Sequence, residues 1–557
     1  MISEKAIEQL AIDLLKEIGY EYYYGQEIAP DSQNPKRQSI EEVIHEEDLR
    51  NALKKLNPKT PPNLIEDAIK TIMHPSSQNL IDNNEQFHKM LVEGVRVNYT
   101  KDGEERGEII KIIDFQNPEN NHFLAVNQYT VKEKNNVKIP DIVLFINGLP
   151  LVVMELKNPT EEDVNIMSAY NQLQTYKETI PSLFTYNEIL IISDGEEARA
   201  GSLAAGFDRF LAWKSADGET ISKTNQLETI IKGLLNKKTI IDFIKNFAVF
   251  QKSKYDDEKT RQIFITLDKK IAAYHQYYAV NKSIETTIKA ISDKTRKAGV
   301  IWHTQGSGKS LTMVYYTGKI IQHLNNPTIV VLTDRNDLDD QLFETFSQSQ
   351  QLLRQKPEKA ESREDLKRLL KVNSGGIIFT TIQKFLPEDG NVFELLSERE
   401  NIIVIVDEAH RTQYGFKAKI DKKTGETTYG YAKYIRDALP NATFIAFTGT
   451  PIEKEDKNTP AVFGDYIDIY DISQSIEDKM TVPIYYESRL IKVSLTEEGK
   501  QLIKEFEEEL EEIGLELVEQ SEKTKRLEQI LGAEDRLNQL AKDIVEHFEK
   551  RQEVFEG

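Results

Sequence analysis

Cysteine is absent from all 557 residues of this chain. That absence excludes disulfide bonds, cysteine-ligated zinc and thiol catalysis, and it is typical of proteins from a reducing cytoplasm. Long apolar runs are also missing, because no segment approaches the roughly 20 residues that a membrane-spanning helix needs. The first residues, MISEKAIEQLAIDLL, carry acidic groups where a signal peptide would be basic. We therefore expect a cytoplasmic protein with no membrane partner.

Basic residues are outnumbered by acidic ones, 71 against 92, so the formal net charge is -21. Proteins that bind nucleic acid usually neutralise its phosphates with cations, and this balance argues against such a partner. Much of the acid, however, is gathered in residues 495–520, which also show the apolar spacing of a solvated helix. The charge of the whole chain therefore leaves the partner undecided.

The length predicts about three or four domains. We divide the chain into four blocks: 1–215, 216–260, 261–490 and 491–557. The first block opens with helical stretches and continues with short strands, of which DIVLFIN and LPLVVMELK are joined by Asn147-Gly148, a strong indicator of a β-hairpin. The second block is rich in lysine and predicts a helical bridge, and the last predicts an acidic helical segment.

Five apolar runs recur in the third block: AGVIWHT, PTIVVLTD, GGIIFTT, NIIVIVDEA and ATFIAFTGT. Each is followed by polar or glycine-rich residues, and most are separated by helical stretches. Continuous apolar strands of this kind indicate a parallel sheet covered by helices on both faces. The ligand of such a sheet binds at the carboxyl ends of its strands. We therefore expect an α/β multidomain fold.

The first of these runs leads into WHTQGSGKS, residues 302–310, a glycine-spaced loop that ends in Lys-Ser. Its glycines let the backbone curl, so that successive N–H groups converge on phosphate oxygens at a helix N-terminus. Lys309 is then placed to reach the β- and γ-phosphates and Ser310 to bind Mg²⁺. The usual pattern begins with glycine, whereas this loop has His303. The predicted phosphate site comprises Thr304, Gln305, Gly306, Ser307, Gly308, Lys309 and Ser310.

VIVDEAH, residues 404–410, strengthens this prediction because it ends another apolar run. Asp407 is placed to hold Mg²⁺ through its water shell, and Glu408 to orient or deprotonate the attacking water. His410 is a candidate for coupling the site to a facing domain. These residues indicate hydrolysis of a nucleoside triphosphate rather than binding alone.

Other segments add candidates of lower specificity. FTGTPIE ends a further run, where Thr448, Gly449 and Thr450 can sense the state of the phosphate site. Gln276 lies upstream of the loop, where an adenine-reading glutamine would stand. Polar residues after the two intervening strands are candidates for contact with a phosphodiester backbone: Arg335, Thr380, Thr381 and Gln383.

A second constellation lies on the two arms of the Asn-Gly hairpin. Asp141 begins one strand, while Glu155 and Lys157 alternate onto one face of the next, so the three side chains can converge. Two carboxylates can bind one or two Mg²⁺ ions, and the lysine can polarise the attacking water or steady the phosphate. Gln172 and Tyr176, four apart on the following helix, can turn toward the same point.

The spacing leaves the rest of the metal shell open. Asp114, Glu85 and Glu93 are the alternatives for an additional acidic residue, and nothing in the sequence chooses among them.

The ordered motifs of the third block resemble the first RecA-like lobe of a superfamily 2 helicase or translocase of the DEAH-box type. Asp141, Glu155, Lys157, Gln172 and Tyr176 resemble a PD-(D/E)xK nuclease core. Together they resemble the restriction and motor subunit of type I restriction-modification enzymes, and the resemblance spans nearly the whole chain. It implies a type I site-specific deoxyribonuclease with ATP and Mg²⁺ as cofactors. It also implies translocation on double-stranded DNA, cleavage far from the recognition site, and methylation and specificity subunits as partners.

Two alternatives stay open: another nuclease-helicase, of a repair or type III-like kind, and a non-cutting ATP-dependent DNA scaffold with a decayed nuclease fold. After residue 490 the sequence shows no second series of strands and no arginine-finger motif. We therefore expect a second RecA-like lobe to be missing and the isolated chain to have little DNA-stimulated ATPase activity.

Overall fold

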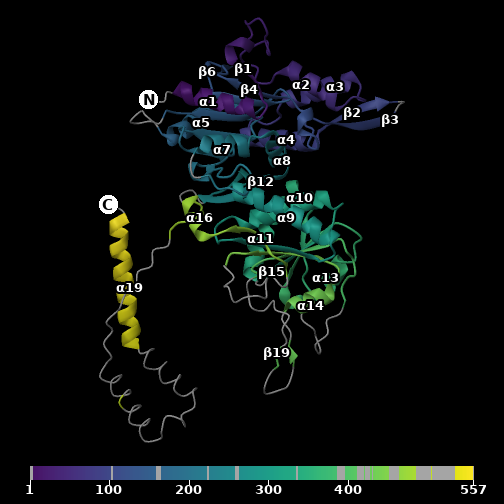
Figure 1. Cartoon of the computed structure of the whole chain (residues 1–557), viewed down its shortest axis with the longest axis vertical. Coiled ribbons are helices and arrows are strands. Elements are labelled where there is room, and N and C mark those ends of the chain that lie inside the picture. The colour runs from purple at the N-terminus through teal and green to yellow at the C-terminus, as the bar shows by residue number, and fades with distance from the viewer. Residues whose placement is uncertain are drawn as a thin grey trace. The chain divides into compact units, whose positions relative to one another are not determined.

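The structure is a computed structural model of the chain (Figure 1). It describes residues 4–101, 104–158, 165–222, 225–257, 262–333, 336–385, 395–409, 419–420, 427–428, 431–450, 463–483, 504 and 534–555. Contacts divide the chain into two units, Met1–Val482 and Pro483–Gly557, and each is described by itself.

A mixed seven-stranded sheet organises the N-terminal part of the first unit, in the order β1-β4-β7-β8-β9-β10-β11. β1 pairs with β4 and β8 with β9 in parallel, whereas the other neighbours are antiparallel. The central strands are buried along their whole length, as expected for apolar runs covered on both faces. The strands are β1 (Glu21–Tyr24), β4 (Phe123–Asn127), β7 (Ile142–Ile146), β8 (Leu149–Leu156), β9 (Ile189–Ser193), β10 (Ala198–Gly201) and β11 (Leu211–Ala212).

Helices α1 (Glu4–Glu17) and α5 (Ile166–Thr179) pack against this sheet. α1 contacts β1, β4 and β8, while α5 contacts β8 and β9. α1 is amphipathic and buries Ile7, Ala11 and Leu15 on one face. Both helices therefore reach β8, the strand that carries Glu155.

The other described elements of this region surround the sheet: η1 (Gly25–Ile28), α2 (Glu46–Leu56), α3 (Pro62–Met73), α4 (Leu80–Glu93), the ribbon of β2 (Val95–Lys101) and β3 (Glu104–Ile110), η2 (Pro118–Asn120), the ribbon of β5 (Val131–Glu133) and β6 (Asn136–Lys138), α6 (Pro181–Phe184) and η3 (Phe207–Arg209).

The β7–β8 hairpin has the turn that the sequence predicts. Asn147 and Gly148 have φ angles of 53° and 80°, and a type I′ turn needs both to be positive. A Cβ on Gly148 would lie 2.5 Å from the carbonyl oxygen of His45. The turn therefore requires glycine at this position for space as well as for conformation.

The predicted helical bridge is only partly helical. Helices α7 (Gln226–Gly233) and α8 (Lys237–Asn246) are followed by an antiparallel ribbon of β12 (Ala248–Asp257) and β13 (Gln262–Ile271). Among its described side chains the ribbon buries few apolar groups, chiefly Val249 and Phe250. The many lysines of this segment led the sequence prediction to a helical bridge.

An all-parallel seven-stranded sheet follows, in the order β16-β17-β15-β18-β21-β14-β22. The five predicted apolar runs form β14 (Lys297–His303), β15 (Thr328–Thr333), β17 (Ile377–Thr381), β18 (Ile402–Val406) and β21 (Thr443–Thr448). The sequence analysis missed two edge strands, β16 (Pro357–Lys359) and β22 (Tyr466–Tyr470), which are short or incompletely buried. The predicted α/β class with a RecA-like parallel sheet is confirmed, and the sheet that precedes it is mixed.

Helices accompany this sheet, and small elements lie between its strands: α9 (Tyr274–Ser292), α10 (Lys309–His323), α11 (Asn336–Gln348), α12 (Gln350–Leu353), α13 (Arg363–Leu369), η4 (Ile382–Phe385), β19 (Lys419–Ile420), β20 (Thr427–Thr428), α14 (Tyr431–Ala438) and α16 (Ile472–Glu477).

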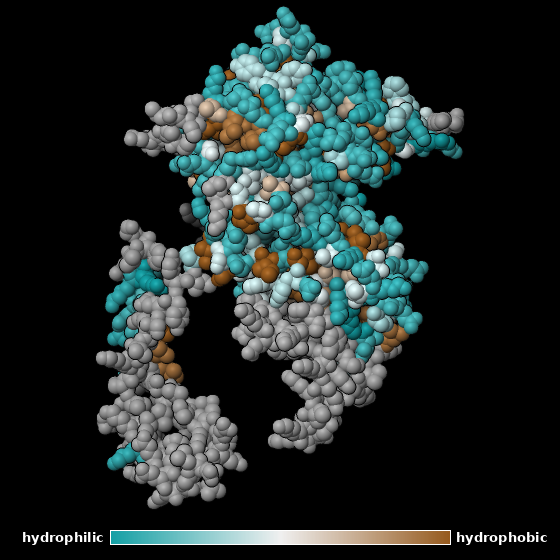
Figure 2. Space-filling model, viewed as in Figure 1, coloured by the Kyte–Doolittle hydropathy of each residue, from teal (hydrophilic) through white to brown (hydrophobic). Residues whose placement is uncertain are grey.

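In the second unit, α19 (Glu534–Phe555) exposes Leu537, Ile544 and Phe548 at helical spacing, and brown atoms mark apolar residues on this helix in Figure 2. The acidic run at 495–520 lies outside the described residues, apart from Lys504. Within the described part of the chain, no helix combines the length and apolar character required to cross a membrane.

Candidate active sites

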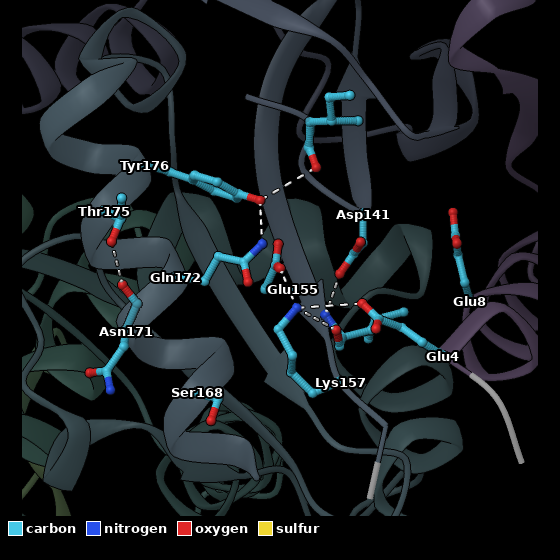
Figure 3. Close-up of polar contacts among 12 residues, drawn as sticks. Glu4, Glu8, Asp141, Glu155, Lys157, Ser168, Asn171, Gln172, Thr175 and Tyr176 are labelled. Atoms are coloured by element: carbon cyan, nitrogen blue, oxygen red, sulfur yellow. Dashed lines mark hydrogen bonds and ion pairs between the residues drawn. The ribbon is translucent and has the colours of Figure 1, made fainter. Parts of the chain in front are cut away.

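Asp141 and Glu155 meet at one end of the β7–β8 hairpin (Figure 3). Ile142 pairs with Met154 in the antiparallel ladder. Asp141, just before Ile142, and Glu155, just after Met154, therefore lie at the same edge of the sheet. Asp141 Oδ2 accepts a 2.7 Å hydrogen bond from the backbone N–H of Leu156. Both carboxylates are buried, Asp141 with 7% and Glu155 with 0% of its surface exposed.

Lys157 joins this pair from the end of β8. Its Nζ donates to Glu155 Oε1 at 2.7 Å and to the carbonyl oxygen of Leu156 at 3.0 Å, and it lies 3.4 Å from Glu4 Oε1. Glu155 and Lys157 emerge on one face because they are two residues apart on an extended chain. The structure thus brings together the three residues that the sequence singles out, and their catalytic role stays a prediction.

The two carboxylates are electrostatically under-compensated. Burial, reinforced by the charge of Asp141, raises the pKa of Glu155 to about 8. Burial also raises the pKa of Asp141 to about 6, against the hydrogen bond from Leu156. Burial lowers the pKa of Lys157, but the adjacent Glu155 outweighs it and the net shift is upward. Glu155 Oε2 is buried and, within the described structure, has no hydrogen-bond partner.

Gln172 and Tyr176 lie on the side of α5 that faces Glu155 (Figure 3). Gln172 Nε2 donates to the Tyr176 hydroxyl at 2.5 Å, and that hydroxyl lies 3.4 Å from the carbonyl oxygen of Ile139. Burial, followed by the charge of Glu155, raises the pKa of Tyr176. The predicted turn of this pair toward the carboxylates is therefore present.

None of the three proposed additional acids lies in this cluster. Asp114, Glu85 and Glu93 line a separate cavity of about 1080 Å³ that does not include Asp141 or Glu155. The Asp114 carboxylate caps its own loop, accepting from the backbone N–H groups of Gln116 and Asn117 and from Asn120 Nδ2. These assignments are corrected, because local spacing in the sequence does not report which helix packs beside a strand end.

The acidic residues that do lie beside the carboxylate pair are Glu4 and Glu8 of α1 (Figure 3). Glu4 approaches Lys157, and Glu8 accepts a 2.7 Å hydrogen bond from Asn127 Nδ2. Sequence analysis missed both. Their four-residue spacing on an amphipathic helix was the available indication, because it places both on one face.

The second candidate site lies at the carboxyl edge of the parallel sheet. β14 is the neighbour of β21, and β21 is the neighbour of β18. Because parallel strands end at the same edge, the glycine loop after β14, Asp407 after β18, and Thr448 at the end of β21 are brought together.

Within this site, Lys309 faces the acidic pair. Burial lowers the pKa of Lys309, while Glu408 and Asp407 oppose that shift, which places all three charges in one neighbourhood. A Cβ on Gly449 would lie 2.7 Å from Lys309 Nζ and 3.0 Å from Gln305 Cγ. Glycine at 449 therefore lets the loop and the lysine approach β21 closely.

The loop has the predicted curl, with φ of 83° at Gly306 and 84° at Gly308. Ser307 Oγ donates to the carbonyl oxygen of Thr304 at 2.6 Å, which closes the turn. α10 begins at Lys309, so Ser310 lies in its first turn. Successive N–H groups at a helix N-terminus form an anion-binding site.

The other residues that the sequence assigns to the nucleotide site make contacts within their own loops or with the glycine loop. The backbone N–H of Glu408 donates to Asp407 Oδ1 at 3.0 Å, and Thr448 Oγ1 lies 3.3 Å from both the N and O of Thr450. Gln276 Nε2 donates to the carbonyl oxygen of Gly308 at 3.0 Å. Its role in reading adenine stays a prediction.

Some predicted contacts are buried or undescribed. Thr380 and Thr381 end β17 with 1% and 6% exposure, so they need a rearrangement to reach a phosphodiester backbone. Gln383 lies in η4. His410 and Arg335 lie outside the described residues.

Two family models match the chain. Residues 1–209 match the type I restriction enzyme R protein N terminus, and residues 275–553 match the SWI2/SNF2 ATPase. The first match includes the Asp141 cluster and the second includes the glycine loop and Asp407. The ATPase match implies ATP as the ligand of the second site.

Curated relatives match the chain over nearly its whole length. The HindI type I restriction enzyme endonuclease subunit of Haemophilus influenzae is 46% identical, over 100% of this chain and 52% of its own length. A putative type I restriction enzyme endonuclease subunit of Methanocaldococcus jannaschii, MjaIXP, is 36% identical over 99% of this chain and 52% of its own length. The chain thus spans about half the length of these relatives.

Solved structures resemble the chain only weakly. A fragment of a putative type I HsdR subunit from Vibrio vulnificus has a TM-score of 0.24 at 17% identity, covering 64% of this chain and 56% of that one. The Hef helicase domain of Pyrococcus furiosus has a TM-score of 0.28 at 18% identity, covering 44% of this chain and 53% of that one. Likeness at this level supports no inference about either site.

Proposed function

Because this chain belongs to the family of type I restriction enzyme R subunits, we propose that it is the ATP-dependent endonuclease and double-stranded DNA translocase subunit of a type I restriction-modification complex. The observation that carries this proposal is the presence of two sites in one chain. A buried Asp-Glu pair with an adjacent lysine lies at the end of two strands of a mixed sheet, and a glycine loop lies beside an Asp-Glu pair at the edge of a parallel sheet.

The carboxylates at the first site fit Mg²⁺. Oxygen ligands suit this ion, and Glu155 supplies a buried oxygen that accepts no hydrogen bond from the described residues. Within the described structure no three His, Asp or Glu side chains are grouped for metal binding, so Asp141 and Glu155 would share the ion with water and phosphate oxygens. When bound, Mg²⁺ polarises the scissile phosphate and lowers the pKa of the attacking water.

Side chains of the protein supply the remaining interactions with the phosphate at this site. Lys157 is held against Glu155 by a 2.7 Å ion pair, and from there its ammonium can steady negative charge that develops on the phosphate. Gln172 and Tyr176 offer hydrogen bonds to the phosphate backbone, which position DNA without reading its sequence.

At the second site we assign ATP binding to the loop from Thr304 to Ser310. Lys309 would neutralise the β- and γ-phosphates, Ser310 and Asp407 would hold Mg²⁺, and Glu408 would orient the attacking water. Energy from this site would move DNA past the nuclease. Double-stranded DNA and the methylation and specificity subunits are the proposed partners, on the strength of the relatives' described role as endonuclease subunits.

Cleavage of closed circular DNA by the chain assembled with its partner subunits tests the proposal. Asp141→Ala should reduce cleavage on the order of 100-fold or more and leave ATP hydrolysis intact, because it removes a metal ligand. Lys309→Ala should abolish ATP hydrolysis and, with it, cleavage. Two variants outside both sites serve as controls and should retain both activities. Asp114→Ala changes a residue of the separate cavity, and Lys59→Ala changes an exposed lysine between α2 and α3.

The outcomes separate the alternatives. Cleavage that survives Asp141→Ala would refute the nuclease assignment. Cleavage that needs no partner subunit would favour another nuclease-helicase, and ATP hydrolysis without cleavage in the wild type would favour a non-cutting scaffold.

A further inference from the structure

Two side chains in the first turn of α9 form hydrogen bonds with two consecutive carbonyl groups of the glycine loop. His275 Nε2 lies 3.0 Å from the carbonyl oxygen of Ser307, and Gln276 Nε2 lies 3.0 Å from that of Gly308. A Cβ on Gly308 would lie only 2.7 Å from Gln276 Nε2. Neighbouring side chains on one helix therefore hold neighbouring peptide groups on the loop.

Holding these carbonyls also orients the N–H groups that follow them. In a trans peptide the C=O and the next N–H point in opposite directions. When the Ser307 carbonyl points to His275, the N–H of Gly308 points away from α9, and the Gly308 carbonyl directs the N–H of Lys309 in the same way. These N–H groups open α10, where phosphate oxygens are expected to bind.

The hydrogen bond to Ser307 requires one tautomer of the His275 imidazole. A carbonyl oxygen can only accept, so Nε2 must carry the proton. Burial, with a smaller contribution from the charge of His303, lowers the pKa of His275 to about 4. The ring is therefore neutral near pH 7, with Nε2 as its donor.

The ring is also held in position from the other side. It stacks on Tyr470 with centroids 3.9 Å apart and planes 7° from parallel. The Tyr470 carbonyl accepts a 2.9 Å hydrogen bond from the N–H of Thr304, and its hydroxyl donates to Asp478 at 2.7 Å. His303, at the irregular first position of the loop, packs edge-on against His275 and binds Asp468 at 2.8 Å. A buried network thus connects α9, the loop and β22.

We propose that His275 is a positioning residue for the nucleotide phosphates: its Nε2–H fixes the Ser307–Gly308 peptide so that the Gly308 N–H faces the bound phosphate. This inference rests on the proposed ATP-hydrolysing function and goes beyond it. It gives the histidine, rather than the adjacent glutamine alone, a role in nucleotide binding.

Two substitutions separate the hydrogen bond from the packing. His275→Phe keeps a ring stacked on Tyr470 and removes the donor, whereas His275→Gln keeps a donor at similar reach and removes the ring. With the full chain and mant-ATP as the probe, we expect His275→Phe to weaken binding about 5- to 10-fold, as loss of one hydrogen bond would. We expect His275→Gln to stay within about twofold of the wild type.

In the assembled complex, the same changes should separate KM from kcat. His275→Phe should raise the KM for ATP with little change in kcat, because it alters the cradle and not the Asp407–Glu408 pair. Thermal unfolding of each variant shows whether the fold is retained. If the phenylalanine variant does not fold, His275→Met compared with His275→Gln makes the same comparison at matched length.

Wild-type affinity of the phenylalanine variant would overturn the proposal, as would a glutamine variant that binds as weakly as the phenylalanine one. Lys309→Ala distinguishes this failure from that of the proposed function. If wild type and Lys309→Ala bind mant-ATP equally poorly, the ATP site itself is wrong.

Discussion

Two glutamates at opposite ends of the β8–β9 strand pair are equally buried but have pKa values shifted in opposite directions. Glu155 pairs with Ile192 near the end of β8, whereas the N–H of Glu188, just before β9, donates to the carbonyl oxygen of Leu151. Their exposed fractions are 0% and 1%. Yet the pKa of Glu155 is raised to about 8, and the pKa of Glu188 is lowered.

The difference lies in the charges that face each carboxylate. Burial raises the pKa of Glu188, but Lys269 and His88 outweigh it, with Nζ and Nδ1 at 2.7 Å and 2.9 Å from Oε2. Burial lowers the pKa of Lys269 despite the adjacent Glu188 carboxylate. The 2.7 Å contact and the lowered pKa of Glu188 nevertheless support a charged pair. Lys269 also donates to Asn84 Oδ1, so the cluster ties β13 to α4.

At the other end of the β8–β9 strand pair, a single ammonium group lies among several carboxylates. Lys157 contacts Glu155 and Glu4, while Asp141 repels Glu155. Incomplete compensation of buried charge is costly, and it is found where a ligand supplies the missing charge. Burial alone therefore does not distinguish a ligand site from a structural cluster, whereas the balance of buried charge does.

The largest expected effect comes from unbalancing the structural cluster. Glu188→Gln leaves the Lys269 ammonium buried without its carboxylate, and we expect the free energy of unfolding to fall by about 3–5 kcal/mol. Denaturant unfolding measures this change. Glu196→Gln, at an exposed position after the same strand, should change stability by less than about 0.5 kcal/mol. A loss as small as the control's would show that Lys269 is neutral.

At the candidate nuclease site we expect the glutamate-to-glutamine substitution to increase the free energy of unfolding rather than decrease it. Glu155→Gln should stabilise the metal-free protein at pH 8 by on the order of 2 kcal/mol, because it removes an under-compensated buried charge. The folded-state pKa of Glu155 is raised from 4.5 to about 8, so its contribution to stability is complete below about pH 4.5 and is lost as pH rises to about 8. The benefit of glutamine should therefore grow over that window.

Unfolding in EDTA at pH 4.5 and pH 8 tests this difference. Glu188→Gln should destabilise the protein at pH 8. If Glu155→Gln destabilises it as well, Lys157 already compensates the charge of the two carboxylates.

The smallest expected effect is the stabilisation by Mg²⁺. At ten times its dissociation constant the ion should add about 1.4 kcal/mol to the wild type. The gain should be larger at pH 8 than at pH 5.5, because the carboxylates must lose their protons to bind. Glu155→Gln should remove most of it and Asp114→Ala none of it. An equal gain in all three proteins would place the ion elsewhere.

Local patterns predicted much of this architecture. The apolar runs that became β14, β15, β17, β18 and β21 are long and continuous, and burial on both faces leaves that record in sequence. Asn147-Gly148 predicted its turn because few residues adopt two positive φ angles. The β12–β13 ribbon escaped prediction because the many lysines of this segment led to the prediction of a helical bridge.

The sequence by itself determined which chemical groups are available: a glycine-spaced loop ending in Lys309, an Asp-Glu pair at 407, and Asp141, Glu155 and Lys157 on a hairpin. Within each motif a short spacing makes these groups neighbours along the chain, and the ends of the strands that carry the motifs place them at one edge of a sheet. Tertiary structure alone decided which distant residues join them. α1 brings Glu4 and Glu8 to the carboxylates, and α9 brings His275 to the carbonyl of Ser307. Packing of helices on sheets sets those contacts. The spacing of Glu4 and Glu8 shows that they share one face of a helix, but not which strand that face meets.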